Sequence, residues 1–263
     1  MKFTFKIQEY QTQAVDAVVN VFEGQPFNGG ASYVRDLGGS NELSITAEGF
    51  ANEPIAPGVD LFKNIRKIQH DSNIAESDEL VHKLGRVQLD VEMETGTGKT
   101  YVYIKTMFEL NKRYGWSKFI IVVPSIAIRE GVLKSFNDME DHFMEQYGKK
   151  ARAFVYDSKN LALIDSFSQS SDINVMIINT QAFNSSFNKD KNREGRAGDS
   201  AARIIYSERD DFGSRRPIDV IAANNPIIIM DEPQKMAGIL ALPDALFKYA
   251  KPYALESILN ALR

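Results

Sequence analysis

Glu92-Met-Glu-Thr-Gly-Thr-Gly-Lys-Thr100 is the most informative segment of this chain. Residues typical of a β-strand precede it, and a helical pattern follows it from Tyr101 to about Tyr114. A strand, a glycine loop, Lys-Thr and a helix together form the architecture of a phosphate-binding P-loop. Glycines let backbone N–H groups approach phosphate oxygens, and the helix N-terminus favours their negative charge. The stretch therefore predicts a binding site for a nucleoside triphosphate.

One position departs from the strict P-loop pattern G-x-x-x-x-G-K-[ST], because Met93 stands where the first glycine is expected. A chance turn rich in Gly and Thr is the alternative, but the strand before and the helix after it favour the P-loop. We expect Lys99 to reach the β- and γ-phosphates and the Thr100 hydroxyl to help hold Mg²⁺. The residues expected to bind the nucleotide through this loop are Thr95, Gly96, Thr97, Gly98, Lys99 and Thr100.

A second acidic motif completes the predicted site. Ile227-Ile-Ile-Met230 predicts a buried strand, and Asp231-Glu232 follow at its carboxyl end, where open α/β sheets bind ligands. We expect Asp231 to hold Mg²⁺, directly or through water, and Glu232 to polarise the water that attacks the γ-phosphate. Such acidic pairs also cap helices, but the P-loop in the same predicted sheet favours catalysis. The predicted catalytic residues are Lys99, Asp231 and Glu232.

Strands alternate with helices from residue 86 onward, which implies a parallel sheet with right-handed crossovers. The long helix of this series has a possible break near Asn137. The predicted strands are 86–93, 118–123, 151–156, 173–179 and 226–230. The predicted helices are 10–22, 100–114, 126–147 and 159–167, with a helical start at 181–187.

Two segments interrupt this regular pattern. Residues 32–85 form an insertion between the first helix and the P-loop strand, in which we expect loops, a possible hairpin and a short helix near 61–69. Residues 188–217 mix basic residues with nearly as many acidic ones, which predicts a solvated, mobile loop. A nucleic-acid patch is the alternative interpretation of the second segment.

The composition limits the class of protein. The 263 residues, 43% hydrophobic and 25% charged, suit one α/β domain with an insertion. The net charge of −4 gives no bulk support for a nucleic-acid partner, although a basic groove can lie on an acidic protein. The absence of cysteine excludes disulfides and thiolate ligands and fits a cytoplasmic location. The three histidines lack metal-ligand spacing, and no apolar run is long enough for a bilayer, so no membrane partner is expected.

The motifs together resemble a known family. Asp231-Glu232-Pro233-Gln234 is similar to motif II of superfamily 2 helicases and translocases. With the P-loop and Phe119-Ile-Ile-Val-Val-Pro-Ser-Ile-Ala-Ile-Arg-Glu-Gly131, the chain resembles the Res subunit of type III restriction–modification enzymes over most of its length. The resemblance implies a single RecA-like P-loop domain over residues 1–263, with a central, mostly parallel sheet flanked by helices.

The same resemblance implies a function, cofactors and partners. The function is ATP-driven DNA translocation or switching that licenses cleavage of unmodified DNA, with ATP and Mg²⁺ as cofactors. The implied partners are double-stranded DNA and a Mod methyltransferase subunit. Such motors need a second RecA-like domain, and the family carries a nuclease domain, but neither is expected within these residues. We therefore expect an N-terminal portion of a longer polypeptide that binds nucleotide weakly and hydrolyses it poorly by itself.

Further site residues follow from the resemblance alone. Gln11 is expected to read the adenine edge, with Gln8 or Gln13 as alternatives, and Gln234 belongs to the nucleotide site through motif II. Motifs Ia and Ib are expected to contact the sugar–phosphate backbone of one DNA strand. Strand exits and helix caps would equally explain several residues of these two motifs. The expected DNA contacts are Pro124, Ser125, Arg129, Thr180 and Gln181.

Other functions remain open on the sequence alone. Another superfamily 2 motor, such as a type I restriction motor subunit or a repair helicase, would share the same motifs. A nucleotide-binding module that no longer hydrolyses ATP is a second alternative, and a P-loop kinase for a small molecule is a third.

Overall fold

A parallel β-sheet forms the centre of the computed structural model, which describes residues 5–29, 31–37, 46–80, 87–180, 182, 204–236 and 257–262. Within these residues the sheet has six strands in the order β3-β8-β7-β4-β6-β5, and every neighbouring pair is parallel. The α/β class with a parallel sheet is therefore confirmed. The strands are β3 (Val87–Glu92), β4 (Lys118–Val123), β5 (Ala151–Val155), β6 (Ile173–Asn179), β7 (Ile227–Asp231) and β8 (Ser257–Leu262).

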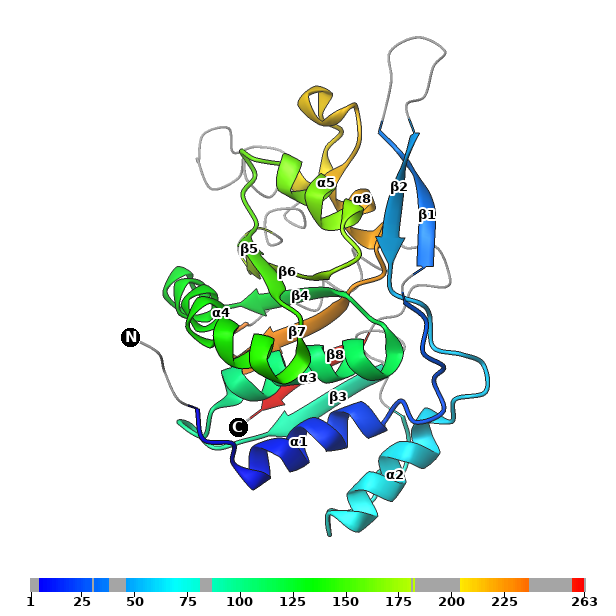
Figure 1. Cartoon of the computed structure of the whole chain (residues 1–263), viewed down its shortest axis with the longest axis vertical. Coiled ribbons are helices and arrows are strands. Elements are labelled where there is room, and N and C mark those ends of the chain that lie inside the picture. The colour runs from blue at the N-terminus through cyan, green and yellow to red at the C-terminus, as the bar shows by residue number, and fades with distance from the viewer. Residues whose placement is uncertain are drawn as a thin grey trace, which may run out of the picture.

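Helices cover both faces of this sheet (Figure 1). One face carries α1, α3 and α4, and the other carries α5 and α8. These arrangements bury two separate apolar clusters, one on each side of the sheet. The helices are α1 (Glu9–Asn20), α3 (Lys99–Tyr114), α4 (Ile126–Tyr147), α5 (Ala162–Gln169) and α8 (Pro217–Ala223).

The central strands are mostly apolar because both of their faces are covered. In β4, Phe119 and Ile121 pack into the cluster under α1, α3 and α4, whereas Ile120 and Val122 pack into the cluster under α5 and α8. Each of these side chains is at most 1% exposed. Burial of one such side chain stabilises the fold by roughly 1.5–3 kcal/mol.

Helix α4 is continuous, so the predicted break near Asn137 is wrong. Val132, Phe136, Met139 and Phe143 recur at helical spacing and are all buried, which gives the helix one unbroken apolar face. This face packs against α3 and the sheet, and tertiary packing of this kind outweighs the weak helix propensity of a single asparagine.

The insertion before the P-loop contains the expected hairpin and helix. Strands β1 (Ala31–Asp36) and β2 (Thr46–Ala51) pair antiparallel, and α2 spans Leu61–Asp71. Asn52 attaches the hairpin to the sheet. Its Oδ1 accepts from the backbone N–H groups of Ser117 (2.7 Å) and Lys118 (2.9 Å), and its Nδ2 donates to the Lys118 carbonyl (2.8 Å).

Residues 204–217 correct another expectation. The predicted solvated loop is wrong for this part, because Ile205 and Phe212 are buried and Arg215 forms an ion pair with Asp165 at 2.9 Å. The helical start at 181–187, except Ala182, and residues 188–203 lie outside the described residues, as do Arg86 and His82. Among the helices that the structure describes, none combines the length and apolar character needed to cross a membrane.

We expect Asn52→Ala to destabilise the fold by roughly 2–4 kcal/mol, because it leaves the buried Ser117 and Lys118 amides without their acceptor. The free energy of unfolding in urea measures this loss. Asn137→Ala is the matched control, since Asn137 is exposed on α4, and its effect is expected to stay within about 0.5 kcal/mol. Equal stabilities of the two variants would contradict the anchoring role of Asn52.

Candidate nucleotide site

The P-loop lies between the end of β3 and the first residue of α3. Gly96 (φ 82°) and Gly98 (φ 90°) adopt left-handed backbone conformations that suit glycine. A Cβ atom on Gly98 would lie 2.5 Å from Nε2 of Gln11, so this position also lacks space for a side chain. The loop leads directly into the 16-residue helix α3, whose first N–H groups face an incoming anion.

Helix α1 holds the P-loop from the side. Nε2 of Gln11 donates to the Thr97 carbonyl at 2.9 Å, and the Tyr10 hydroxyl donates to the same carbonyl at 3.0 Å. Gln13 is exposed and instead donates to Glu9 within α1 at 3.2 Å. The structure thus brings Gln11 to the loop, and its role as an adenine reader stays a prediction.

Lys99 lies across the loop. Its ammonium donates to the Met93 carbonyl at 3.2 Å, and it lies 3.8 Å from Oε1 of Glu232. The P-loop and the acidic motif are therefore neighbours, although β8 separates their strands in the sheet. An anion bound by the loop would therefore lie next to a carboxylate.

The two acidic residues lie at the end of β7, where Asp231 is the last residue of the strand and Glu232 follows it. Asp231 is 7% exposed, and burial raises the pKa of its carboxyl, with a further rise from the charge of Glu232; nearby Lys99 opposes this shift. Glu232 has φ 59°, a left-handed conformation that costs a non-glycine residue about 1–3 kcal/mol. Its Oε2 lies 3.2 Å from Nζ of Lys235. Such a pair of carboxylates gains from an added cation.

Tyr103 provides a test of whether Mg²⁺ fits here. Its hydroxyl is buried close to the side chains of Thr100 and Asp231, with which it interacts, but it forms no hydrogen bond of ordinary geometry among the described residues. Burial, and next the charge of Asp231, raise the pKa of this hydroxyl. Thr100 lies on the same side, one helical turn earlier on α3. A hydrated Mg²⁺ on Thr100 and Asp231 would offer a water to this unsatisfied hydroxyl, so the residues fit the cation.

The expected DNA contacts lie at the carboxyl ends of β4 and β6, which are neighbouring strands. Ser125 caps α4, since its Oγ accepts from the Ile128 amide at 3.3 Å, and Pro124 precedes it. The Arg129 guanidinium is paired with Glu130 at 2.8 Å. Thr180 donates its amide to the Val123 carbonyl at 3.1 Å. Gln181 and the side chain of Gln234 lie outside the described residues, and DNA contact stays a prediction for the whole set.

Three further residues lie at the candidate site that the sequence did not predict there: Tyr10, Tyr103 and Lys235. Only Tyr103 had a local signal, because its spacing from Thr100 places both on one face of the helix after the P-loop. Tyr10 and Lys235 reach the site through the packing of α1 and the short 3₁₀ turn Pro233–Lys235, which a single sequence does not reveal.

Comparisons with known proteins agree on one family. A family model described as "Type III restriction enzyme, res subunit" matches residues 4–238. The Res subunit of the type III restriction-modification enzyme EcoP15I of Escherichia coli is 30% identical over 238 residues, which make up 86% of this chain and 22% of that protein.

Two further relatives show the same relation. The EcoPI Res subunit of Escherichia phage P1 is 30% identical over 246 residues, or 89% of this chain and 23% of that protein. The StyLTI Res subunit of Salmonella typhimurium is 31% identical over 170 residues, or 58% of this chain and 16% of that protein. The chain thus spans less than a quarter of the length of the relatives it matches.

We expect Gly98→Ala to weaken binding of a fluorescent ATP analogue with Mg²⁺ by at least about tenfold, because the added Cβ strains the loop and collides with Gln11. Equilibrium titration of the purified chain measures the affinity. Gly131→Ala is the control, since no atom lies within 4 Å of its added Cβ and alanine favours the helix there. Unchanged affinity in Gly98→Ala would contradict the assignment of this loop to phosphate.

We expect Tyr103→Phe to weaken nucleotide binding by about tenfold when Mg²⁺ is present. Binding of nucleotide without Mg²⁺ should be unchanged. The variant removes only the hydroxyl that faces Asp231, so the packing of the ring is retained. Titrations with nucleotide in the presence of Mg²⁺ and of a chelator give both affinities. An equal change under the two conditions would show that Tyr103 acts through the fold and not through the cation.

Proposed function

Because the chain belongs to the family of type III restriction enzyme Res subunits, we propose that its helicase-like domain binds and hydrolyses ATP as the first motor domain of such a subunit. One observation carries the proposal. Lys99 of the P-loop lies 3.8 Å from Glu232 of the acidic motif, although the two are far apart in sequence. The chain spans less than a quarter of its relatives, so the activity of a complete Res subunit is part of the proposal.

Binding of ATP would change the contacts of the P-loop. Lys99 now donates to the Met93 carbonyl, and phosphate oxygens would replace this acceptor with a charged one. The N–H groups that open α3 and the left-handed glycines would hold the same phosphates. Mg²⁺ bound to Thr100 and Asp231 would supply neutralisation of the phosphate charge.

Hydrolysis then requires a positioned water. We assign this task to Glu232, whose carboxylate lies between Lys99 (3.8 Å) and Lys235 (3.2 Å). The water oxygen attacks the γ-phosphorus as the bond to the β–γ bridging oxygen breaks, which yields ADP and phosphate. Glu232 accepts the proton of the attacking water, and Lys99 stabilises the charge on the transferred group.

The position of the predicted DNA contacts supports a motor over a small-molecule kinase. Ser125 and Thr180 follow β4 and β6, and Asp231 ends β7, which pairs with β4. A nucleic-acid strand at this edge would therefore lie close to the nucleotide, as coupling of hydrolysis to movement requires. The proposed partners are double-stranded DNA and a Mod methyltransferase subunit, in a system that cleaves unmodified DNA.

We expect Lys99→Ala to lower DNA-stimulated ATP hydrolysis by about 10²–10³-fold in the complete Res polypeptide, because it removes a charge aimed at the transferred phosphate. Phosphate release with and without duplex DNA measures the rate. Lys134→Ala, at an exposed position on α4, is the matched control and should retain the full rate. Hydrolysis that survives in Lys99→Ala would reject the P-loop assignment, and a wild-type rate indifferent to DNA would reject the motor.

A further inference from the structure

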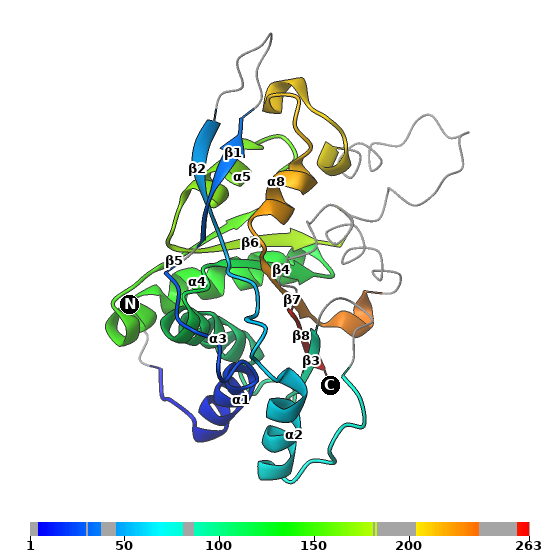
Figure 2. The same ribbon diagram turned by 90° about the vertical axis from the view of Figure 1, so that its right-hand side faces the viewer.

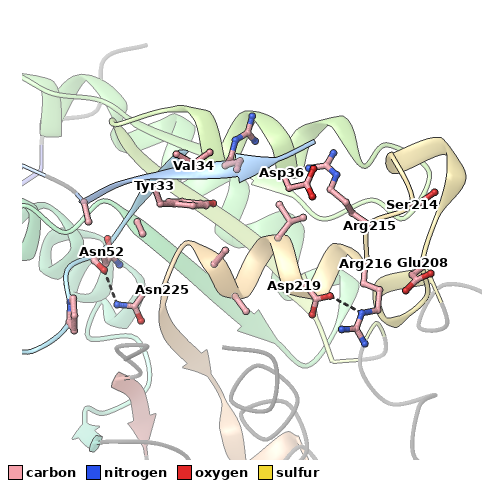
Figure 3. Close-up of a pocket in the computed structure, with 17 residues that line it drawn as sticks. Tyr33, Val34, Asp36, Asn52, Glu208, Ser214, Arg215, Arg216, Asp219 and Asn225 are labelled. Atoms are coloured by element: carbon pink, nitrogen blue, oxygen red, sulfur yellow. Dashed lines mark hydrogen bonds and ion pairs between the residues drawn. The ribbon is translucent and has the colours of Figure 1, made fainter. Parts of the chain in front are cut away.

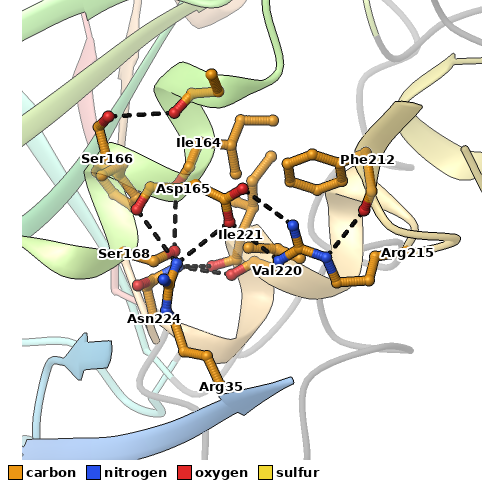
Figure 4. A network of polar contacts seen from close by, with 12 residues as sticks. Arg35, Ile164, Asp165, Ser166, Ser168, Phe212, Arg215, Val220, Ile221 and Asn224 are labelled. Atoms are coloured by element: carbon orange, nitrogen blue, oxygen red, sulfur yellow. Dashed lines mark hydrogen bonds and ion pairs between the residues drawn. The ribbon is translucent and has the colours of Figure 1, made fainter. Parts of the chain in front are cut away.

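Two arginines share one carboxylate between the hairpin and α5. Asp165 of α5 accepts from Arg35 of β1 at 3.2 Å and from both terminal nitrogens of Arg215 at 3.0 and 2.9 Å (Figure 4). Among the described residues, Asp165 is the one carboxylate recorded in an ion pair with either arginine. Arg35 is 3% exposed and the side chain of Arg215 is 14% exposed, so water compensates little of the second positive charge. The cluster therefore lacks one negative charge.

Arg35 also has donors without a partner. Its Nη1 donates to the backbone carbonyl and to Oδ1 of Asp165, both at 3.2 Å. Its Nε and Nη2 are buried and have no hydrogen-bond partner among the described residues. Buried charged donors of this kind are costly to leave unpaired. Nε–H and one Nη2–H leave the same edge of a guanidinium in parallel, and this edge can bind both oxygens of a carboxylate or a phosphate.

A cavity of about 760 Å³ lies between β1 and α8, and Arg35 is part of its lining (Figure 3). Figure 2 shows the hairpin beside α5 and α8, on the opposite side of the sheet from α1 and α3. Cavities of roughly 300–1,000 Å³ are the size that receives small-molecule ligands. Small apolar side chains form much of the wall, which suits the apolar body of such a ligand. These residues are Ala31, Ala51, Pro54, Val220 and Ala222.

The polar lining limits the size of an anionic ligand. Asp36 and Glu208 are exposed, and Asp219 lies 2.7 Å from Nε of Arg216. A polyanion such as DNA would meet these carboxylates, whereas a small anion can reach the cationic cluster without them. The neutral polar residues of the lining are Tyr33, Asn52, Ser214 and Asn225.

Tyr33 lies beside Arg35 on the same face of β1. A Cβ atom on Gly49 of β2 would lie 2.6 Å from Cδ of Arg35 and 2.7 Å from Cζ of Tyr33, so the phenol tip is next to the arginine stem. The Tyr33 hydroxyl donates to Oδ1 of Asn224 at the long distance of 3.4 Å. Since Nε and Nη2 of Arg35 are covered, a ligand must displace a neighbouring side chain, and Tyr33 is a neighbour that also lines the cavity.

We propose that this cavity binds a small organic anion, whose carboxylate or phosphate pairs with Nε and Nη2 of Arg35 and whose apolar body contacts the small side chains of the wall. Such an anion supplies the negative charge that the two arginines lack, and it satisfies two buried donors at once. A neutral ligand or a water molecule would satisfy donors but would leave the charge of the cluster unbalanced.

The cavity lies away from the candidate nucleotide site. Its lining residue Asn52 contacts Ser117 and Lys118 at the amino end of β4, whereas the P-loop and Asp231 lie at the carboxyl ends of their strands. The anion and a nucleotide can therefore be bound at the same time. Saturation with ATP and Mg²⁺ should not displace the anion, and competition between the two would place the anion in the nucleotide site and overturn the proposal.

Benzoate and benzamide are matched probes, because they have nearly the same shape and differ in charge. NMR spectra of the purified chain with ¹⁵N-labelled arginine follow the Nε–H resonance of Arg35, which is assigned by its loss in Arg35→Lys. We expect benzoate to shift this resonance with a Kd on the order of 1 mM, and benzamide to leave it unchanged. Phenyl phosphate distinguishes the two anions, since the tighter binder of the two identifies the ligand class. A shift with benzamide equal to that with benzoate, or no shift with either anion, overturns the proposal.

Two variants test the site by affinity for the tighter-binding anion, measured from the NMR signals of the ligand. Arg35→Lys keeps a positive charge near Asp165 but lacks the parallel donors, so we expect binding to weaken by at least about tenfold. Ala223→Phe leaves Arg35 intact and fills the cavity from α8, with an expected loss of similar size. Ala162→Phe, at an exposed position of α5 outside the lining, is the matched control and should bind as wild type. Wild-type affinity in Arg35→Lys or in Ala223→Phe overturns the proposal.

Discussion

The common direction of the strands is the constraint on which the site depends. Because β3, β4, β6 and β7 run parallel, the segments after them open on the same edge of the sheet. This arrangement brings Lys99 after β3 to within 3.8 Å of Glu232 after β7, although β8 lies between the two strands. A reversal of β7 would move its carboxylates to the opposite edge, away from the P-loop. Burial of both faces of the sheet fixes this direction, since the crossovers must run through helices.

Two lysines lie near the two carboxylates of the site. Asp231 and Glu232 are neighbours, and burial raises the pKa of Asp231 because an ionised group loses hydration there. Lys99 and Lys235 offset part of this cost, and each lies near a different carboxylate oxygen of Glu232. Lys99 therefore has two partners, the carboxylate of Glu232 and the Met93 carbonyl. The strained Glu232 backbone is consistent with a residue whose position matters more than its conformational energy.

Local signals explain what the sequence could predict. The apolar strand run, the glycine loop and the helix after it are contiguous, so the sheet class and the P-loop helix followed directly from them. The prediction of a solvated loop was wrong for residues 204–217 because composition does not show which charges are paired. Arg215 has the character of a solvated charge, but it pairs with Asp165, which is distant in sequence. The predicted break near Asn137 was wrong because a polar residue on the outer face of α4 does not interrupt the buried apolar face of this helix. The place of Tyr103 in the site could be predicted only if the face of α3 that lies toward β7 were known.

The insertion is attached to the sheet at the edge opposite the candidate nucleotide site. Its hairpin is attached at the amino edge of the sheet through Asn52, whose three hydrogen bonds engage the start of β4. The carboxyl edge stays open for nucleotide and for the predicted DNA contacts. Asp165 then couples the hairpin to the turn before α8, and α8 leads into β7, whose last residue is Asp231. The hairpin is therefore connected, through Asp165 and α8, to the strand that carries the acidic motif.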